Sequence, residues 1–426
     1  MSRWRTFSQT MFGVMLFLLL ASHASDSGGP FTWLALALPL PTAVANWHIG
    51  ILTLLPVLVV GGWWLGDRPA RFCWGETAVT IPLFAFSLLV VFRLTSATAH
   101  LAAMLALFWF VYLFLVNHPR WQTNWLWRVL AVVLLLQGVV AVAQFLLQRE
   151  LGLAWLGEPT LDLLVEGTSV AQRDGQNWLR AYGLNSHPNQ LGLLLTALIL
   201  LVWPQHKCAS SGVWRGIFWL ALAAGFAGLL VSLSRSAWLA LGVGGLVLAW
   251  PRGSVTTRSW REFAVPVAVF SAGLLLFALL YGDVMASRLV ALDSPLESRS
   301  LWERQRDLGI ALRVLEERPF LGNGPNRYLA AAQAHDPAAV TVHNVLLLVG
   351  AELGLLGLGI WLAFWLWPLW RYGRSAVHRA GTAVWLALIL IALVHPEPTL
   401  FLPKGSVLWS FAAAQWSARA QMEAII

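Results

Sequence analysis

The sequence has few charged residues. Asp, Glu, Lys and Arg together make up 11% of its 426 residues, whereas soluble domains carry about 25%, so a soluble globular protein is excluded. The chain is instead 58% hydrophobic, with a mean hydropathy of +0.68. Several apolar runs reach about 18 residues, which is enough to cross a hydrocarbon core of about 30 Å as a helix. These properties predict an all-α polytopic membrane protein.

Cysteine is also scarce, and several familiar cofactor motifs are missing. Cys73 and Cys208 are the only two cysteines, too few and too far apart for a disulfide framework or a metal cluster. The sequence contains no residues with metal-ligand spacing, no P-loop and no dinucleotide fingerprint. We therefore expect no metal and no cofactor.

The basic balance of the chain does not indicate a nucleic-acid partner. The net charge is +8 and the pI is near 10.3, but no basic helix or aromatic–basic motif accompanies this charge. In membrane proteins an excess of Lys and Arg mainly sets the orientation of the spans. The expected partners therefore include membrane lipids and exclude nucleic acid.

Twelve apolar segments can be distinguished along the chain. They lie at residues 10–22, 31–65, 77–94, 98–116, 125–148, 190–204, 214–231, 236–250, 263–281, 343–370, 381–394 and 400–418. The second is interrupted by Pro39 and Pro41, so we count it as one crossing preceded by a half-helix or re-entrant piece. The first is predicted to be a span and not a cleaved signal peptide, because no small-residue cleavage site precedes "SDSGGP". About twelve transmembrane helices are expected, with both termini on one side.

The basic residues predict which side that is. On this alternation one face collects Arg3, Arg5, Arg68, Arg71, Arg120, Arg128, Lys207, Arg215, Arg252, Arg258, Arg261, Arg371, Arg374, Arg379 and Arg419. Short loops rich in Lys and Arg are cytoplasmic. Both cysteines lie in the same loops, where a reducing compartment would keep them as thiols. The termini are therefore predicted to be cytoplasmic.

Two long connections, at about 149–189 and 282–342, then lie on the external face. Long loops in compact proteins are usually functional or disordered. The second loop is predicted to hold an amphipathic helix over the outer mouth of the bundle, with Ser294 as its cap and Pro295 in its first turn. Its apolar positions are Leu301, Leu308, Ile310, Leu312 and Leu315, and its stop signals are Pro319 and Gly322.

The chain is divided by this topology into four parts of one integrated membrane domain. They are the N-terminal helices (1–148), the helices with the first external loop (149–281), the external helical loop (282–342) and the C-terminal helices (343–426).

Three unusual polar positions share the external boundary on this topology. Arg180 lies in "LRAYGLNSHPNQLG", Arg235 in "VSLSRSAWLAL", and His343 at the start of "HNVLLLVGAELGLLG". Each has an ordinary structural interpretation. Arg180 could be a snorkelling interface anchor, and His343 an interfacial hydrogen-bonding residue. Arg235 is harder to explain in this way, because a cation within a span costs about 2.5–3.5 kcal/mol at the helix centre.

Neighbouring polar residues also have structural interpretations. Asn344 would cap the helix that follows it, and Gly354 and Gly357 would allow close helix packing. His187, Pro188 and Asn189 form a helix start with proline in the first turn.

Two guanidinium groups and one imidazole suit a particular chemistry. Arginine presents a fixed fork that matches phosphate oxygens and stays cationic. Histidine, with a usual pKa of about 6.5, can take a proton from a hydroxyl near neutral pH. A lipid-borne pyrophosphate, with its tail in the bilayer and its head at the external interface, fits these groups. A glycosidase pair of carboxylates is not evident, although the external loops offer Asp283, Asp293, Glu297 and Glu303.

The same residues resemble the O-antigen ligase and polymerase superfamily of bacterial inner-membrane glycosyltransferases. The resemblance extends from about Arg180 to the C-terminus. It rests on "RAYGLNSHPNQLG", "SLSRSAWLAL", "RPFLGNGPNRY" and "HNVLLLVGAELGLLG". The last piece is similar to the family's His-Asn/Ser element followed by a nine-residue spacer and Gly-x-x-Gly.

The resemblance implies a reaction and a set of site residues. Members transfer a glycan from undecaprenyl pyrophosphate to a hydroxyl on the lipid A core, in lipopolysaccharide biosynthesis. The transfer occurs on the periplasmic side of the inner membrane without a metal, and we expect inversion at the anomeric carbon. Arg180 and Arg235 would bind the pyrophosphate leaving group. His343 would either activate the acceptor hydroxyl or position the pyrophosphate, and both roles stay open.

Further substrate contacts are expected around these three. Tyr182, Trp302 and Tyr328 are candidates for stacking on sugars, although aromatic residues also anchor proteins at membrane interfaces. Arg327 is a candidate phosphate contact. The remaining candidate substrate-binding residues are Asn344, His187 and Asn189.

Three alternatives remain at this stage. A polymerase that extends a lipid-linked glycan, or a protein O-oligosaccharyltransferase, would share the chemistry and differ only in the acceptor. A polytopic transporter would also suit twelve crossings and the prolines at 39 and 41. Transporters, however, place polar groups near the bilayer midplane, often within an internal repeat. Here the ionisable groups collect at one face and no repeat is visible.

Overall fold

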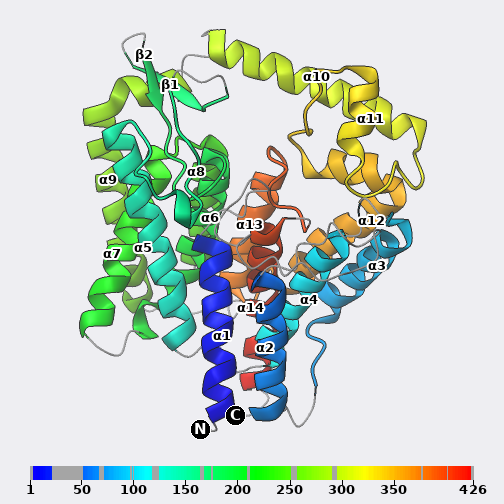
Figure 1. The fold of residues 1–426 in the computed structure, drawn as a ribbon. Coiled ribbons are helices and arrows are strands. Elements are labelled where there is room, and N and C mark those ends of the chain that lie inside the picture. The colour runs from blue at the N-terminus through cyan, green and yellow to red at the C-terminus, as the bar shows by residue number, and fades with distance from the viewer. Residues whose placement is uncertain are drawn as a thin grey trace. The chain divides into compact units, whose positions relative to one another are not determined.

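The computed structural model describes most of the chain. The described residues are 3–21, 51–66, 72–95, 98, 100–117, 124–163, 167–173, 176–208, 212–250, 257–289, 295–375, 378–400 and 402–423. They form fourteen α-helices and one small hairpin of strands (Figure 1). The helical prediction is confirmed in outline, and the hairpin is an addition to it. The pairing of two four-residue strands within a long polar loop gives no periodic signal strong enough to recognise in the sequence.

The helices form two compact units. Unit 1 comprises Met1–Phe72 and Arg120–Val290, and unit 2 comprises Cys73–Pro119 and Ala291–Ile426. The elements of unit 1 are α1 (Arg3–Ala21), α2 (Ile51–Gly66), α5 (Asn124–Leu147), η4 (Ala154–Leu156), β1 (Val170–Arg173), β2 (Gln176–Leu179), α6 (Pro188–Val202), η5 (Trp203–Cys208), α7 (Gly212–Val231), α8 (Arg235–Ala249) and α9 (Thr257–Leu289). The elements of unit 2 are α3 (Thr77–Arg93), α4 (His100–Asn117), α10 (Pro295–Glu317), α11 (Tyr328–His335), α12 (Val345–Tyr372), α13 (Arg379–Ala392) and α14 (Pro403–Glu423).

Each of the twelve apolar segments corresponds to a helix, from α1 to α9 and from α12 to α14. For the segment at 31–65 this holds only for the part in α2, and Pro39 and Pro41 lie outside the described residues. Four of the described helices contain a stretch long and apolar enough to cross a membrane. These stretches are Trp125–Leu147, Gly212–Val231, Ala264–Arg288 and Val345–Tyr372. The chain is thus a helical membrane protein, and the number of crossings stays a prediction.

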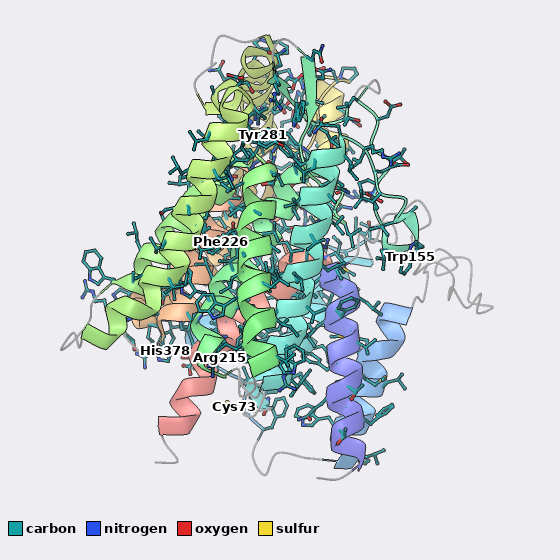
Figure 2. The ribbon with its side chains drawn as sticks, turned by 90° about the vertical axis from the view of Figure 1, so that its left-hand side faces the viewer. Cys73, Trp155, Arg215, Phe226, Tyr281 and His378 are labelled. Carbon is teal, nitrogen blue, oxygen red and sulfur yellow. The ribbon has the colours of Figure 1, made fainter. Side chains whose placement is uncertain are left out.

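The helices of unit 1 pack through small residues. A Cβ at Gly138 of α5 would lie 2.3 Å from the carbonyl oxygen of Ala224 in α7, so the two backbones touch there. Figure 2 shows Arg215 at one end of this unit and Tyr281 at the other, with Phe226 between them. β1 and β2 form an antiparallel hairpin, with Val170 opposite Leu179. The guanidinium of Arg173 lies 5.3 Å from the centre of the Tyr281 ring, which places the hairpin at the Tyr281 end.

An aromatic cluster forms much of the core of unit 2. The rings of Trp385 and Trp409, from α13 and α14, are 4.4 Å apart at nearly right angles, and Phe364 of α12 lies 5.0 Å from Trp385. Edge-to-face pairs of this kind add to the stability that burial alone provides. The cluster joins the three C-terminal helices.

The helix predicted in the second long loop is present as α10, and it begins at Pro295 as expected. Its buried face differs from the predicted one. Leu308 and Leu312 are exposed, and the residues that pack against α11 and α12 are Ile310, Ala311 and Val314. The prediction for the two leucines was wrong because it counted only apolar residues, whereas the buried stripe also contains a carboxylate, described below.

Helix α12 is interrupted at Gly354, where the backbone has φ 67° and ψ −170°. The loop after α10 fits into this break, and the amide of Leu355 donates to the carbonyl of Pro319 at 2.7 Å. A Cβ at Gly354 would lie 2.3 Å from the carbonyl of Phe320, and one at Gly322 would lie 2.3 Å from the carbonyl carbon of Glu352. Two of the motifs noted in the sequence, "RPFLGNGPNRY" and "HNVLLLVGAELGLLG", are therefore packed backbone against backbone. This explains why both contain glycine.

Gly354→Ala is expected to destabilise unit 2 by at least about 2 kcal/mol. A backbone in this region costs a non-glycine residue about 1–3 kcal/mol, and the new methyl group also overlaps Phe320. Thermal unfolding in detergent measures the effect. Gly359→Ala is the matched control, because a Cβ there meets nothing within 4 Å. A helical alanine stabilises relative to glycine, so equal melting temperatures for the two variants would contradict this account.

Candidate functional site

In unit 1 the segment that carries Arg180 is held by polar side chains of α5. Gln144 accepts hydrogen bonds from the amides of Tyr182 (3.1 Å) and Gly183 (2.8 Å). Gln137 accepts one from the amide of Leu184 at 3.0 Å. Both glutamines are fully buried, where unpaired amides would be costly. The loop is therefore fixed to the helix through its own backbone.

Arg180 is buried at the turn between α7 and α8. Its Nε donates to the carbonyl of Ser232 at 3.0 Å, and its Nη2 donates to the carbonyl of Leu233 at 3.5 Å. Nη2 also donates to Oδ1 of Asn189 at 2.9 Å. Asn189 lies in the first turn of α6, where His187 is the N-cap and accepts from the Asn189 amide at 3.1 Å. The helix start predicted at His187 and Pro188 is confirmed.

Arg235 begins α8, two residues after Leu233, whose carbonyl is one of the two that Arg180 contacts. Its side chain is half-buried, and Nη1 donates to the carbonyl of Arg288 in α9 at 3.0 Å. Leu233, in the turn before it, has φ +51°. Unit 1 thus places Arg180 and Arg235 at one turn. This turn follows α7, so it lies at the opposite end of that helix from Arg215.

Tyr182 and His187 both contact Ser169. The Tyr182 hydroxyl accepts from the Ser169 amide at 2.7 Å, and Nε2 of His187 lies 3.1 Å from Ser169 Oγ. Tyr182 is buried, so its ring packs within the protein and does not offer a face for sugar stacking. These two residues hold the loop that carries Arg180.

In unit 2 His343 lies at the entrance to α12. The next residue, Asn344, is the N-cap, as predicted. Its Oδ1 accepts from the Leu347 amide at 3.1 Å, and its Nδ2 donates to the carbonyl of Leu393 at 2.9 Å. The start of α12 is thereby tied to the end of α13, which fixes the backbone of His343.

The His343 side chain is 37% exposed and lies beside a buried carboxylate. Its Nδ1 is 3.9 Å from Oδ2 of Asp307 in α10, and its ring is 6.3 Å from the ring of His395. Burial lowers the pKa of His343, and so does Arg304, whereas Asp307 and Glu303 raise it. The net pKa lies below the usual value, so the imidazole is mainly neutral at pH 7.

Asp307 is nearly fully buried, and its cationic neighbour, Arg306, also lies beside a second carboxylate, Asp336. Arg306 donates to its Oδ1 from Nη2 at 2.9 Å and from Nε at 3.2 Å. Arg306 also lies 3.6 Å from Asp336 and donates to the carbonyl of Ala338 at 3.1 Å. The buried carboxylate is thus charge-paired on one oxygen.

The other predicted residues of unit 2 lie at different depths. Tyr328 is buried in the cluster beneath α10, and burial, with a smaller contribution from Asp307, raises its pKa to about 12. Its ring is not available for sugar stacking. Trp302 is 60% exposed, and the guanidinium of Arg306 lies 5.5 Å from its ring centre. Arg327 is exposed, and its Nη2 donates to Oγ1 of Thr95 at 3.3 Å.

Two residues near His343 were missed by the sequence analysis. Asp307 falls on the buried stripe of α10, three and four residues before Ile310 and Ala311, and a carboxylate in that stripe was the available signal. His395 lies in "LVHPEP" at the end of a span, as His343 lies at the start of one. Near it, burial raises the pKa of Glu397 to about 7.

Taken with its apolar helices, this arrangement defines a class: a helical membrane protein with arginine and histidine groups where helices begin. Residues 220–362, about a third of the chain, match the family model described as O-antigen ligase. The match includes Arg235, His343 and Asn344 but begins after Arg180, which lies outside it. No curated protein matches the chain. The resemblance to the O-antigen ligase superfamily is confirmed for this segment.

Proposed function

We propose that the protein transfers a glycan from undecaprenyl pyrophosphate to an acceptor hydroxyl at the periplasmic face of the bacterial inner membrane. The observation that carries this proposal is the segment matching the O-antigen ligase model, which contains both Arg235 and His343. The acceptor we favour is the lipid A core. The donor headgroup, the acceptor and the membrane face all belong to the proposal.

The residues have separate roles in the proposed reaction. The acceptor oxygen attacks the anomeric carbon, the bond from that carbon to the pyrophosphate oxygen breaks, and undecaprenyl pyrophosphate leaves with the bonding electrons. Arg235 and Arg180 stabilise the charge on the leaving group. His343, neutral at pH 7, takes the proton of the hydroxyl. Attack opposite the leaving group inverts the anomeric centre.

The structure supports a sharper division between the two arginines. Arg180 donates to two backbone carbonyls and to Asn189, so much of its capacity is used in holding the turn. Arg235 begins α8 with its side chain half-buried, whereas the side chain of Arg180 is almost fully buried, so Arg235 is the more accessible of the two. We infer that Arg235 makes the principal contact with phosphate, whereas Arg180 also shapes the turn that presents it.

Purified protein in nanodiscs, supplied with an undecaprenyl-pyrophosphate glycan, tests the proposal. Lipid A core, a second lipid-linked glycan and a protein are offered separately as acceptors in the presence of EDTA. Product on lipid A core is the expected result. Product on a glycan or on protein would identify a polymerase or a protein O-oligosaccharyltransferase. No product with any acceptor, together with uptake of a solute by proteoliposomes, would favour a transporter and overturn the proposal.

Cysteine labelling from outside the cell tests the membrane orientation. In a variant with Cys73 and Cys208 replaced by serine, a membrane-impermeant maleimide is expected to label Gly175→Cys and Ala330→Cys but not Val255→Cys. The reason is that only the last lies in a basic, cytoplasmic loop. Labelling after cell lysis should reach all three positions and controls for accessibility. The reverse pattern in intact cells would move the proposed site to the cytoplasmic side.

A further inference from the structure

The buried carboxylate of Asp307 is only partly satisfied. Its side chain is 1% exposed, and burying a carboxylate is costly unless both oxygens find partners. Oδ1 accepts from Arg306, whereas Oδ2 has no hydrogen-bond partner among the described residues. Nδ1 of His343 lies 3.9 Å from Oδ2. That nitrogen is also buried and also without a hydrogen-bond partner in the described part of the chain.

Two unsatisfied polar atoms that face each other call for an explanation. A carboxylate oxygen only accepts hydrogen bonds, whereas a neutral imidazole donates from one nitrogen and accepts at the other. A proton on Nδ1 would satisfy both atoms and leave the lone pair on Nε2 as the base. Closing 3.9 Å to a hydrogen bond needs a shift of about 1 Å, and catalytic hydrogen bonds are often long before substrate binds.

We propose that Asp307 is a positioning residue for His343. Its Oδ2 accepts a hydrogen bond from Nδ1–H and thereby selects the tautomer whose Nε2 takes the proton of the acceptor hydroxyl. The carboxylate stays ionised and stabilises the imidazolium that forms. This inference rests on the proposed function.

The charged and titratable surroundings of the pair set its behaviour with pH. From α10 the relevant groups are Glu303, Arg304 and Arg306, and from α11 and its C-terminus they are Tyr328 and Asp336. After the end of α13, the ring of His395 lies near the His343 imidazole, and Nδ1 of His395 is 4.0 Å from a carboxylate oxygen of Glu397. Asp307 opposes the effect of burial on the pKa of His343. Removing its charge should therefore lower that pKa further.

Nitrogen-15 NMR of histidine-labelled protein in nanodiscs tests the pair without any transfer reaction. His343→Ala identifies the His343 signals. The wild-type protein is expected to have the proton on Nδ1. Asp307→Asn, which keeps the shape of the side chain, should give a mixture of tautomers and a lower pKa. An unchanged tautomer and pKa in Asp307→Asn would overturn the proposal.

Asp336→Asn is the matched control. It removes a second carboxylate near Arg306, 3.6 Å from its Nε, and leaves Asp307 in place. This variant should leave the tautomer and the pKa of His343 unchanged. If Asp336→Asn changes the tautomer and the pKa of His343 as much as Asp307→Asn does, the change is transmitted by Arg306. A direct hydrogen bond between Asp307 and His343 is then excluded as its cause.

The pH dependence of transfer supplies a second test. In the pH profile of kcat, Asp307→Asn is expected to lower the alkaline plateau about 10–100-fold and to move the acidic limb to lower pH. The KM for the donor should stay unchanged. Asp307→Glu should recover part of the loss. If kcat falls equally at every pH and the acidic limb does not move, Asp307 has a purely structural role. If the wild-type protein transfers no glycan, the proposed function fails while the NMR result still decides whether the pair exists.

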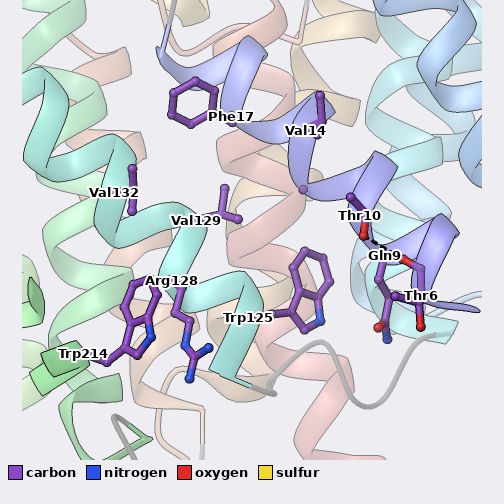
Figure 3. Close-up of a pocket in the computed structure, with 11 residues that line it drawn as sticks. Thr6, Gln9, Thr10, Val14, Phe17, Trp125, Arg128, Val129, Val132 and Trp214 are labelled. Atoms are coloured by element: carbon purple, nitrogen blue, oxygen red, sulfur yellow. Dashed lines mark hydrogen bonds between the residues drawn. The ribbon is translucent and has the colours of Figure 1, made fainter. Parts of the chain in front are cut away.

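A separate hollow lies on unit 1, between α1, α5 and α7, with a volume of about 560 Å³ (Figure 3). One end is polar, with Thr6 and Gln9 of α1 and Arg128 of α5. The other end is apolar, with Phe17 of α1 and Val132 of α5. The guanidinium of Arg128 lies 4.5 Å from the ring centre of Trp214, which holds it at the polar end.

A hollow with one polar and one apolar end suits a single phospholipid, which has a polar headgroup and apolar chains. An acyl chain suits the apolar end, and an anionic phosphate suits the arginine at the polar end, where hydroxyl and amide groups also line the hollow. The sequence topology places Arg128 on the cytoplasmic side, where anionic headgroups are concentrated. We propose that this hollow binds an anionic phospholipid, with its headgroup at Arg128 and one chain along Phe17 and Val132.

Native mass spectrometry of the full chain, titrated with phosphatidylglycerol and with phosphatidylcholine, tests this site. Arg128→Gln is expected to reduce bound phosphatidylglycerol at least fivefold. Arg215→Gln, an exposed cation beside Trp214 that does not line the hollow, should leave binding unchanged. Equal losses in the two variants, or equal binding of the two lipids by the wild-type protein, would overturn the proposal. Melting temperatures verify that both variants are folded.

Discussion

His343→Ala is expected to lower glycan transfer by about 10²–10⁴-fold, which is the usual contribution of a general base. An acceptor hydroxyl is a weak nucleophile until its proton is taken, and His343 is the half-exposed imidazole fixed at the start of α12. The loss should appear in kcat, because the proton moves in the transition state. Transfer to lipid A core by protein in nanodiscs is the measurement.

A second histidine of unit 2 provides the control for this substitution. His335 lies in the last turn of α11, and its Nε2 is 3.0 Å from Glu317. His335→Ala should retain near-full activity. Both variants must remain membrane-inserted with the wild-type melting temperature. Near-full activity in His343→Ala would remove this residue from the mechanism.

The pH dependence of transfer by the wild-type protein has a predicted direction. A general base works in its neutral form, so activity rises as the pH increases through the pKa of His343. Burial and Arg304 place that pKa below about 6.5, so the acidic limb should lie below that value and full activity should be present at pH 7. A limb above pH 7 would indicate that another group controls the reaction.

The parts of the fold that follow from local chemistry were predictable. The start of α6 at His187 and Pro188, the cap at Asn344 and the start of α10 at Pro295 all depend on residues within one helical turn. The apolar segments likewise specify their helices, because in a bilayer the backbone must satisfy its own hydrogen bonds.

The parts that depend on distant contacts were not predictable. Gly354 breaks α12 because the Phe320 backbone occupies the space beside it. No sequence pattern within the helix predicts that contact. Asp307 is buried because α10 packs its carboxylate side against α11 and α12. A stripe of apolar residues was expected there, so the carboxylate beside His343 became visible only in three dimensions.

Arg235→Ala is expected to lower transfer by about 10²–10³-fold, comparable to removing one donor from a preorganised anion site. Arg235→Lys should fall between the wild-type protein and Arg235→Ala, because lysine keeps the charge but loses the planar fork that matches phosphate oxygens. Arg235 is a cleaner test than Arg180, since Arg180 is almost fully buried and its truncation would also remove its hydrogen bonds to the carbonyls of Ser232 and Leu233 at the turn before α8. Arg173→Gln is the control, because Arg173 packs on the rings of Trp178 and Tyr281 in the same unit. If Arg173→Gln and Arg235→Ala reduce transfer equally, with equal losses of melting temperature, the effect is structural and Arg235 does not bind the leaving group.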